Sequence, residues 1–364
     1  MKFIIQTKEL LTALQITGKA IKNSVVPIVE CARLEVSKKK CIVTGSNFEL
    51  FITKTIDCKA DGVIDICISN SKLTSYLREL PEQPLNFEVD ELNDGYLVTI
   101  TDSQGHCKLP GFKGIDYPLT PVIYSEAIEI ETASFHNAIL RTIFAASTDS
   151  SMVFSASLIE FGNGIKTTSA DGRQIAIKSF SDKVMVDKQC LVKPFILNTI
   201  AVMELSDKVS ISYSDTNILF DYGACKVFAR LSEGKYPDCS KFIPTAHPIV
   251  VEFNVAQLAS AIRRVMVFSD KLSEHIRYDL SDGVLVVSAE DVKLNEAGKQ
   301  SVSVDYTGEG LSIGFLGKQM LSILSNLQTE TGFIYFLDEK TVMMVKETKE
   351  SEDLYLNVPS VLVS

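Results

Sequence analysis

The pattern of apolar and polar positions along the chain is written three times. In the stretch FIIQTKELLTAL (3–14), an alternating run with apolar Phe3 and Ile5 leads into an amphipathic helical run. IEIETASFHNAI (128–139) and VEFNVAQLASAI (251–262) have apolar residues at matching places, offset by 125 and then 123 residues. This spacing is that of a domain and not of a solenoid repeat. The sequence therefore predicts three copies of one unit.

Each unit is expected to contain antiparallel strands and two helices. Alternating runs joined by turn residues, such as Asn93-Asp94-Gly95, predict strands and hairpins. Periodic apolar runs predict helices that begin near Lys8, Ser71, Phe135, Pro194, Ala256 and Lys318, with the third reaching Ala146. The fold class is α+β, with helices on one face of antiparallel sheets. Proline-flanked linkers divide the chain into domains at 1–124, 125–246 and 247–364.

Composition indicates an ordinary globular protein of 364 residues, 46% hydrophobic and 23% charged. No apolar run approaches the roughly 18 residues of a membrane span, and the N-terminus lacks the features of a signal peptide. We therefore expect a cytoplasmic protein. The eight cysteines form no CxxC pair, which favours reduced core thiols over a disulfide framework or a zinc site.

The net charge of −10 is distributed unevenly. The six predicted helical stretches together hold ten basic residues against three glutamates, so the rest of the chain is strongly acidic. On any one helix, a basic face is more often just a solvated face. Six equivalent helices with the same bias predict a shared basic surface that would contact phosphates without reading bases. No aromatic residue interrupts the basic faces of these helices, so duplex DNA is favoured over a single strand.

Catalytic and cofactor motifs are missing. The four histidines are far apart in sequence, and the chain has no P-loop, GxGxxG fingerprint or GxSxG elbow. Asp149 and Asp171 could be imagined as a carboxylate pair, but loop aspartates usually form turns. The sequence predicts no catalytic residue, no metal and no cofactor.

Several segments carry a resemblance to a known family. TSADGRQIAIKSF (168–180), EGKYPDCSKFIP (233–244) and YLNVPS (355–360), together with the opening MKF and first helix, resemble the bacterial sliding clamp, the beta subunit of DNA polymerase III. The match runs in order over the whole chain. The resemblance implies a non-catalytic processivity factor of the DNA polymerase complex: a head-to-tail homodimer whose six domains close a ring, with strands outside and twelve helices around duplex DNA. Such a ring stays on DNA by topology and slides on weak backbone contacts.

The resemblance also implies which residues contact DNA. The loop arginine of the family falls at Asn23 here, and Lys22 is expected to replace it. The predicted DNA contacts are Lys19, Lys22, Lys72, Arg78, Arg141, Lys193, Arg263, Arg264 and Lys318.

The family has a peptide groove between its second and third domains, which implies the replicative polymerase, the clamp loader, and repair and translesion polymerases as partners. Two departures from the family pattern predict an altered preference: Arg173-Gln174 stands where a His-Arg pair is usual, and the chain ends Val-Pro-Ser-Val-Leu-Val-Ser. For Ile175, Val342 and Leu356, plain core packing is an equally good interpretation. The predicted groove residues are Phe154, Ala170, Gly172, Arg173, Ile175, Pro237, Phe242, Val342, Leu356, Val358, Pro359 and Ser360.

By position in the family, the ring interface would join the end of the first unit to the first helix of the third. Cys107 and Leu109 are expected to face Val267 and Phe268 of a second copy, with edge strands paired through their main chains. Two other functions stay open at this point. One is an adhesin-like interaction protein without a DNA role, and the other is a hydrolase using Asp171 and Arg173.

Overall fold

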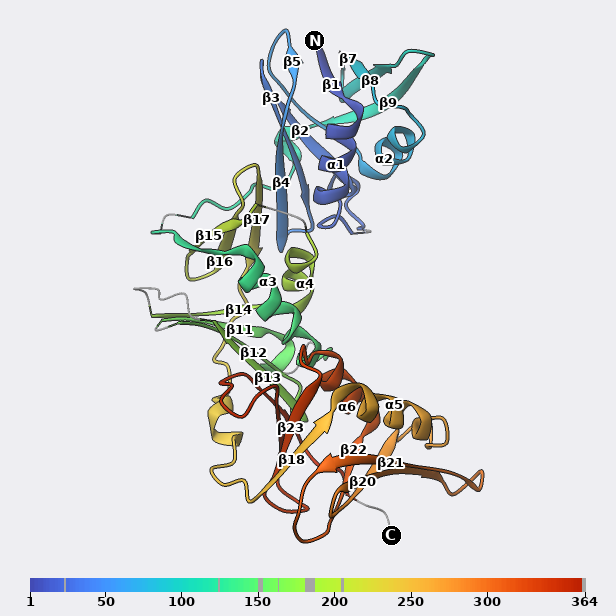
Figure 1. Ribbon diagram of the computed structural model, residues 1–364. Coiled ribbons are helices and arrows are strands. Elements are labelled where there is room, and N and C mark those ends of the chain that lie inside the picture. The colour runs from blue at the N-terminus through green and yellow to red at the C-terminus, as the bar shows by residue number, and fades with distance from the viewer. Residues whose placement is uncertain are drawn as a thin grey trace. The chain divides into compact units, whose positions relative to one another are not determined.

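The computed structural model describes residues 1–22, 24–123, 125–149, 153–162, 164–180, 187–203 and 206–361. The chain forms two compact units, shown with their elements in Figure 1. The first unit comprises Met1–His136 and Asn198–Ser232, and the second comprises Asn137–Leu197 and Glu233–Ser364. Helices α3 (Thr132–Leu140) and α4 (Pro194–Ala201) cross from one unit to the other.

The first unit is built on one antiparallel sheet, in the strand order β10-β15-β16-β17-β4-β3-β2-β6-β9-β8-β7-β1-β5. Its helices α1 (Thr7–Thr17) and α2 (Asn70–Arg78) pack against each other. The strands are β1 (Lys2–Gln6), β2 (Cys31–Val36), β3 (Lys40–Ser46), β4 (Leu50–Asp57), β5 (Lys59–Ala60), β6 (Ile64–Ser69), β7 (Pro84–Leu92), β8 (Gly95–Thr101), β9 (His106–Lys113), β10 (Ile128–Glu131), β15 (Lys208–Tyr213), β16 (Asn217–Asp221) and β17 (Cys225–Arg230).

The second unit is also built on a continuous set of antiparallel strands, in the order β14-β11-β12-β13-β25-β24-β23-β18-β21-β20-β19-β22. Helices α5 (Val255–Met266) and α6 (Gly317–Ser325) lie side by side in it (Figure 1). The strands are β11 (Ser157–Gly162), β12 (Gly164–Ala170), β13 (Gln174–Phe180), β14 (Lys188–Val192), β18 (Ile249–Asn254), β19 (His275–Ser281), β20 (Val284–Asp291), β21 (Glu296–Asp305), β22 (Leu311–Leu316), β23 (Thr331–Phe336), β24 (Met343–Lys346) and β25 (Leu354–Asn357).

The predicted threefold repeat is confirmed by the first helix of each copy, because α1, α3 and α5 begin in the same way. Phe3 and Ile5 of β1 are buried, and α1 buries Leu10 and Leu14 against the same core. Because the first amides of a helix have no partner inside it, each needs an acceptor from elsewhere. The first amide of α1 donates to the Gln83 carbonyl, that of α3 to Asp207 and that of α5 to Glu330, all at 2.9–3.0 Å. The acceptor therefore comes 75 or 76 residues later in every copy.

The units do not coincide with the three expected domains, because strands pair across the expected boundaries. Strand β17 pairs with β4, with Phe228 opposite Phe51, and β13 pairs with β25, with Ile175 opposite Leu356. The middle third of the chain thus contributes one group of strands to each unit.

The predicted end of the third helix at residue 146 is wrong. Helix α3 ends at Leu140, and a short 3-10 helix, η3 (Ile143–Ala145), follows. The buried hydroxyl of Thr142 donates to the carbonyl oxygens of Ala138 and Ile139, at 2.9 and 3.2 Å, and so competes with continued helical bonding.

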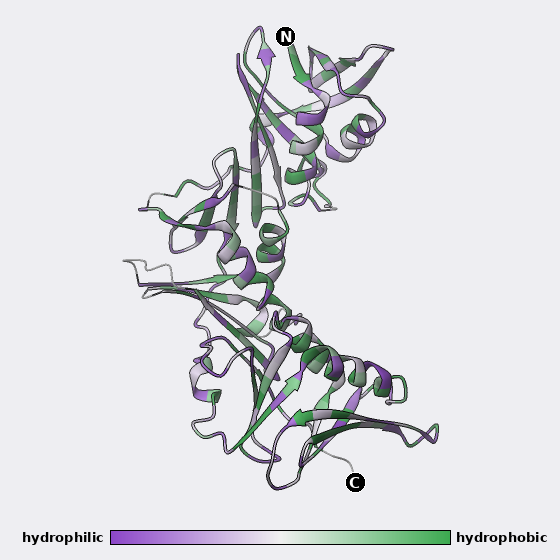
Figure 2. Cartoon of the chain, viewed as in Figure 1, coloured by the Kyte–Doolittle hydropathy of each residue, from purple (hydrophilic) through white to green (hydrophobic). Residues whose placement is uncertain are grey.

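The distribution of apolar residues follows the elements. Figure 2 shows hydrophobic and hydrophilic residues together on α1 and α2, as expected for helices with one buried face. All eight cysteines are free thiols, and seven are buried. Within the described ranges, no helix is long and apolar enough to cross a membrane.

Candidate functional site

Most of the basic residues predicted to contact DNA are exposed. In the first unit, α1 buries Leu10, Ala13 and Leu14, while Lys19 and Lys22, which follow it, are exposed. On the adjacent helix α2, Lys72 and Arg78 are exposed on the side opposite the buried Leu73 and Leu77. The members of this group are Lys19, Lys22, Lys72 and Arg78.

The second unit repeats the arrangement on α5 and α6. Helix α5 starts at the cap Asn254, whose side-chain oxygen accepts from the Gln257 amide at 2.9 Å. Arg263 and Arg264 occupy its last turn, where the helix dipole favours positive charge, and both are exposed. On α6, the exposed Lys318 pairs with Glu274 at 2.5 Å. Lys193, just before α4, is half-buried.

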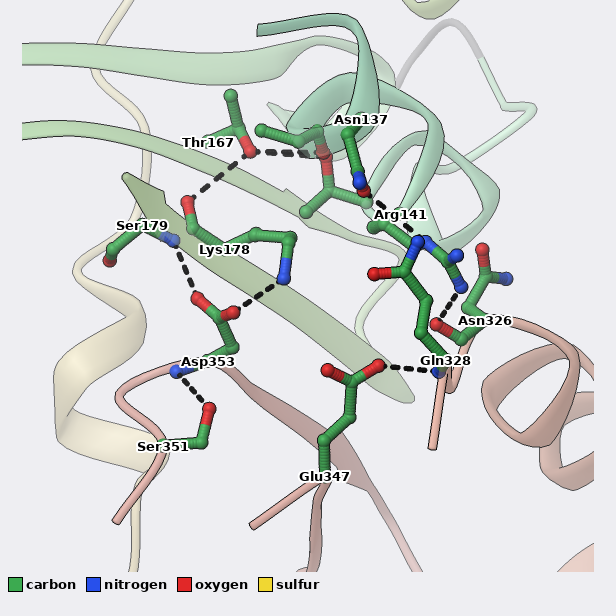
Figure 3. A network of polar contacts seen from close by, with 12 residues as sticks. Asn137, Arg141, Thr167, Lys178, Ser179, Asn326, Gln328, Glu347, Ser351 and Asp353 are labelled. Carbon is green, nitrogen blue, oxygen red and sulfur yellow. Dashed lines mark hydrogen bonds and ion pairs between the residues drawn. The ribbon is translucent and has the colours of Figure 1, made fainter. Parts of the chain in front are cut away.

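Arg141 is placed differently from the predicted phosphate contact. Figure 3 shows its guanidinium turned toward the end of α6, where Nη1 donates to the Asn326 carbonyl oxygen. Its Nε also lies 3.4 Å from the Asn137 side-chain oxygen. The last carbonyls of a helix lack intrahelical partners, so the arginine satisfies one of them. In the second unit Arg141 therefore joins the end of α3 to the end of α6.

A second polar contact in Figure 3 joins β13 to the segment before β25. Lys178 Nζ lies 2.5 Å from Asp353 Oδ2, and the two side chains are only 16% and 18% exposed. The other carboxylate oxygen accepts from the Ser179 amide at 2.8 Å. This ion pair supports the β13–β25 pairing that brings Ile175 opposite Leu356.

An apolar patch lies on the face of the sheet where β13, β24 and β25 meet. Ala170 and Leu356 are buried in its floor, in contact with the buried Tyr236, Cys239 and Met344. Five half-buried side chains surround the floor and define the patch: Phe154, Ile175, Ile243, Tyr335 and Val342.

The structure brings five predicted groove residues into this apolar cluster: Phe154, Ala170, Ile175, Val342 and Leu356. Pro237 follows the cluster residue Tyr236. Phe242 and Val358 are exposed, and the Val358 amide donates to the Arg173 carbonyl at 2.8 Å. Pro359 and Ser360 are half-buried, and the Ser360 amide donates to the Gly314 carbonyl at 2.8 Å.

Ile243 and Tyr335 belong to the patch but were missed by sequence reasoning. Ile243 stands in the segment EGKYPDCSKFIP, so its apolar side chain was a usable signal. Tyr335 reads as an ordinary residue of an alternating strand, and only the pairing of β23 with β24 places it here.

The segment Asp171-Gly172 is a turn, as predicted. Asp171 Oδ1 accepts from the amides of Arg173 and Gln174, each at 2.8 Å, and Gly172 has a φ of +87°. Asp171 Oδ2 accepts from the Gln174 side chain at 3.1 Å. Because this carboxylate already holds the loop together, it is a poor general base for a hydrolase. Among the described residues, no group of three or more His, Cys, Asp or Glu is placed to hold a metal ion.

The residues predicted for the ring interface lie beside strand edges. Cys107 and Leu109 are on β9, which pairs with β8 from His106 to Gly111 but with β6 only from Gly111 to Lys113. Within the described chain, residues 106–110 therefore present a free main-chain edge.

The second unit presents a comparable edge. Strand β21 pairs with β20 from Glu296 to Ser303 but with β18 only at 304–305. Phe268, at the end of α5, lies over Gly298 of β21, where an added Cβ would come within 2.6 Å of the ring. Val267 is 70% exposed. Sequence reasoning missed three more exposed apolar side chains in loops of this unit: Leu272, Val292 and Leu294. Lys293 and Asp270, 3.9 Å apart, link the two loops.

Comparison with known proteins finds one family along the whole chain. The family described as DNA polymerase III beta subunit matches with its N-terminal domain at residues 1–121, its central domain at 129–238 and its C-terminal domain at 240–360. The chain is 24% identical over 351 residues to the beta sliding clamp of Streptococcus pneumoniae strain R6, covering 92% of each protein. It is 25% identical over 340 residues to that of Chlamydia muridarum, covering 91% of each.

Solved structures show the same fold. The DNA polymerase III subunit beta from Pseudomonas aeruginosa superimposes with a TM-score of 0.94 at 23% identity, with both chains fully covered. The DNA polymerase sliding clamp from Bacillus subtilis gives a TM-score of 0.94 at 21% identity, again with full coverage.

Proposed function

Because the chain belongs to the DNA polymerase III beta subunit family, the beta sliding clamps, we propose that it closes with a second copy into a ring around duplex DNA. It is a processivity factor and not a catalyst. Processivity follows from topology, since a closed ring cannot leave DNA sideways. The observation that supports this most is the recurrence of exposed basic residues on or just after corresponding helices of both units, in a chain whose net charge is −10.

The proposed DNA contacts are the exposed basic residues, which meet phosphates and not base edges. Arg141 is left out because it is half-buried and its guanidinium donates to the Asn326 carbonyl oxygen. Lys318 is kept because its side chain is 74% exposed, although it pairs with Glu274. Lys193 is half-buried and is kept as a lesser contact. Contacts of this kind are sequence-independent and weaken with salt, which suits a ring that must slide. The main contacts are Lys19, Lys22, Lys72, Arg78, Arg263, Arg264 and Lys318.

The apolar patch is proposed as the docking site for a short peptide segment of partner proteins. A linear peptide gains affinity by burying a few apolar anchors against preformed apolar side chains. Phe154, Ile175 and Val342 are half-buried, so they can be covered further. The replicative polymerase, the clamp loader, and repair and translesion polymerases are the proposed partners. The exposed Arg173, beside this surface, would favour an acidic residue next to the anchors.

For ring closure, we propose that the free edge of β9 in one copy pairs with the free edge of β21 in the other. Strand pairing satisfies the main-chain groups of both edges. Val267 and Phe268 would supply apolar burial beside the paired strands.

Retention on circular DNA tests the function. The protein is incubated with a clamp loader, ATP and nicked circular duplex DNA, and the protein that elutes with the DNA is measured before and after one cut linearises the circle. The proposal predicts retention on the circle and loss after the cut. An interaction protein without a DNA role would show no retention, and a protein that simply binds duplex DNA would be retained on both forms.

A further inference from the structure

The tip of the β3–β4 hairpin holds a phenylalanine in an unusual position. Phe48 has a φ of +70°, in the left-handed region that bulky residues rarely adopt. Its side chain is 55% exposed, although it is a large apolar ring. Backbone strain of this kind is a reason to look for a function, since the fold must supply interactions that hold it.

Hydrogen bonds from the neighbouring side chains fix this turn. The Phe48 amide donates to the hydroxyl of the buried Ser46 at 3.0 Å. The side-chain oxygen of Asn47 accepts from the amides of Glu49 and Leu50, at 3.2 and 2.9 Å. The exposed ring is therefore presented by a turn whose backbone is held in place.

The hairpin is anchored to the end of α1, next to the proposed DNA contacts. At Gly45 an added Cβ would lie 2.2 Å from the Thr17 carbonyl oxygen and 3.1 Å from the Ile21 side chain, so only glycine permits this approach. The tip and the segment after α1 surround a small hollow of about 250 Å³. It is lined by Lys22, Ser24, Val29, Asn47, Phe48 and Glu49.

An exposed aromatic ring beside a lysine is the arrangement that binds an unpaired nucleic-acid base, with the ring stacking on the base and the ammonium group near its phosphate. We propose that Phe48 and Lys22 form a stacking site for an unpaired base of single-stranded DNA. This inference rests on the proposed function, which places this end of α1 at DNA. The bases of an intact duplex are already stacked and offer no free face to the ring.

The sequence pattern alone did not show this site. Phe48 lies in the β3–β4 hairpin, outside the helices whose spacing predicts the basic faces. Only the packing of Gly45 against Thr17 brings the ring to the basic end of α1.

The absence of tryptophan from the chain allows a direct test. The substitution Phe48→Trp places the only tryptophan of the chain at the hairpin tip. Titration with an oligo-dT strand is expected to quench its fluorescence, because stacked bases quench indole, while a blunt duplex of the same length leaves it nearly unchanged. No quenching by the single strand at saturation, or equal quenching by the duplex, would overturn the proposal.

Affinity measurements separate stacking from charge. Phe48→Ala is expected to weaken oligo-dT binding at least about fivefold, the lower end of the effect of one stacked base, and to change duplex binding less than about twofold. Phe48→Leu keeps an apolar side chain without a π face and should weaken oligo-dT binding almost as much. Phe112→Ala removes an exposed ring elsewhere on the same unit and serves as the matched control. Unchanged oligo-dT affinity in Phe48→Ala would also refute the proposal.

The two proposals can fail separately. If the unmodified protein is not retained on nicked circular DNA, the proposed function is refuted. Normal retention together with the absence of quenching in Phe48→Trp would refute only the stacking site.

Discussion

At the scale of single residues, His136 shows how burial sets the chemistry of a side chain. It lies in the core of the first unit, with Nε2 3.0 Å from the Tyr222 hydroxyl. Burial lowers the pKa of His136 to about 4, because the charged imidazolium is poorly solvated there. The folded unit therefore keeps this histidine neutral at a pH where the unfolded chain would protonate it.

This pKa shift predicts an acid-dependent loss of stability. The unfolded chain binds the proton near pH 6.5 and the folded chain only near pH 4, so the free energy of unfolding falls as the pH drops through this window. Below about pH 4 the buried His136 lowers the free energy of unfolding by about 3 kcal/mol, and above about pH 7 this loss is absent. Urea unfolding at pH 7.5 and pH 5 should show about 2 kcal/mol of this loss, because pH 5 lies inside the window and not below it.

His136→Gln should reduce the difference between the two pH values, because an amide can bond to Tyr222 without titrating. His106→Gln, which replaces a histidine at an exposed position, is the matched control. An identical pH dependence for wild type and His136→Gln would refute the assignment.

At the scale of elements, the second unit depends on contacts between segments far apart in the sequence. Lys178 on β13 pairs with Asp353, which lies just before β25, and Arg141 reaches the end of α6 (Figure 3). These polar contacts lie beside the strands that carry Ile175 and Leu356. Their loss should affect both stability and the shape of the apolar patch.

Breaking the ion pair tests this role. Lys178→Met leaves the Asp353 carboxylate poorly solvated and without its cation, and should lower the free energy of unfolding by about 2–3 kcal/mol. This loss is smaller than for a fully buried ion pair, because both side chains keep some exposure to water. Adding Asp353→Asn removes the unpaired charge, keeps an oxygen for the Ser179 amide and should restore most of the loss. Thermal or urea unfolding of the three proteins gives the comparison, and a single variant as stable as the wild type would contradict the role of the pair.

The apolar patch makes its own prediction. Ile175→Asp puts a charge among the half-buried side chains of the apolar patch. It should weaken binding of a labelled Leu/Phe-bearing clamp-binding peptide at least about tenfold, because the apolar anchors of the peptide lose an apolar contact. Ile42→Asp, at an exposed apolar position on β3, is the matched control. Fluorescence anisotropy measures both, and equal affinities would place the peptide elsewhere.

Many helices, strands and turns could be predicted from the sequence because they depend on residues close together in the chain. The turn Asn93-Asp94-Gly95 joins β7 and β8 with Leu92 opposite Gly95, as its residues indicated. The sequence also predicted the strand with alternating Phe3 and Ile5 and the apolar face of α1, all of which pack in one core. The early end of α3 was missed, because the buried Thr142 hydroxyl bonds back to the helix only in the folded context.

The candidate site could be predicted only in part. The basic helix faces were visible from spacing, but whether Arg141 meets solvent or the Asn326 carbonyl depends on the packing of α3 beside α6. The pairings of β17 with β4 and of β13 with β25 join distant segments, and alternation alone specifies no partner. The unusual backbone of Phe48 could not be predicted either, because no residue pattern indicates a positive φ at a phenylalanine.

At the scale of the whole molecule, assembly should depend on a few exposed apolar residues. Phe268→Asp places a charge beside the free edge of β21 and should convert the proposed dimer to monomers, because the charge would be buried without a partner in the proposed interface. Sedimentation analysis measures the mass. Val63→Asp, at an exposed apolar position of the first unit, should leave the dimer intact. A dimer that survives Phe268→Asp would place the interface elsewhere.

The central claim is that the chain stays on DNA because it encloses it, and end-blocking tests this most directly. After loading, the lifetime of the complex is measured on linear duplex DNA with free ends and on the same DNA with both ends blocked by bulky tethered proteins. Enclosure predicts rapid loss from free ends and long retention when the ends are blocked. Equal lifetimes on the two substrates would contradict it.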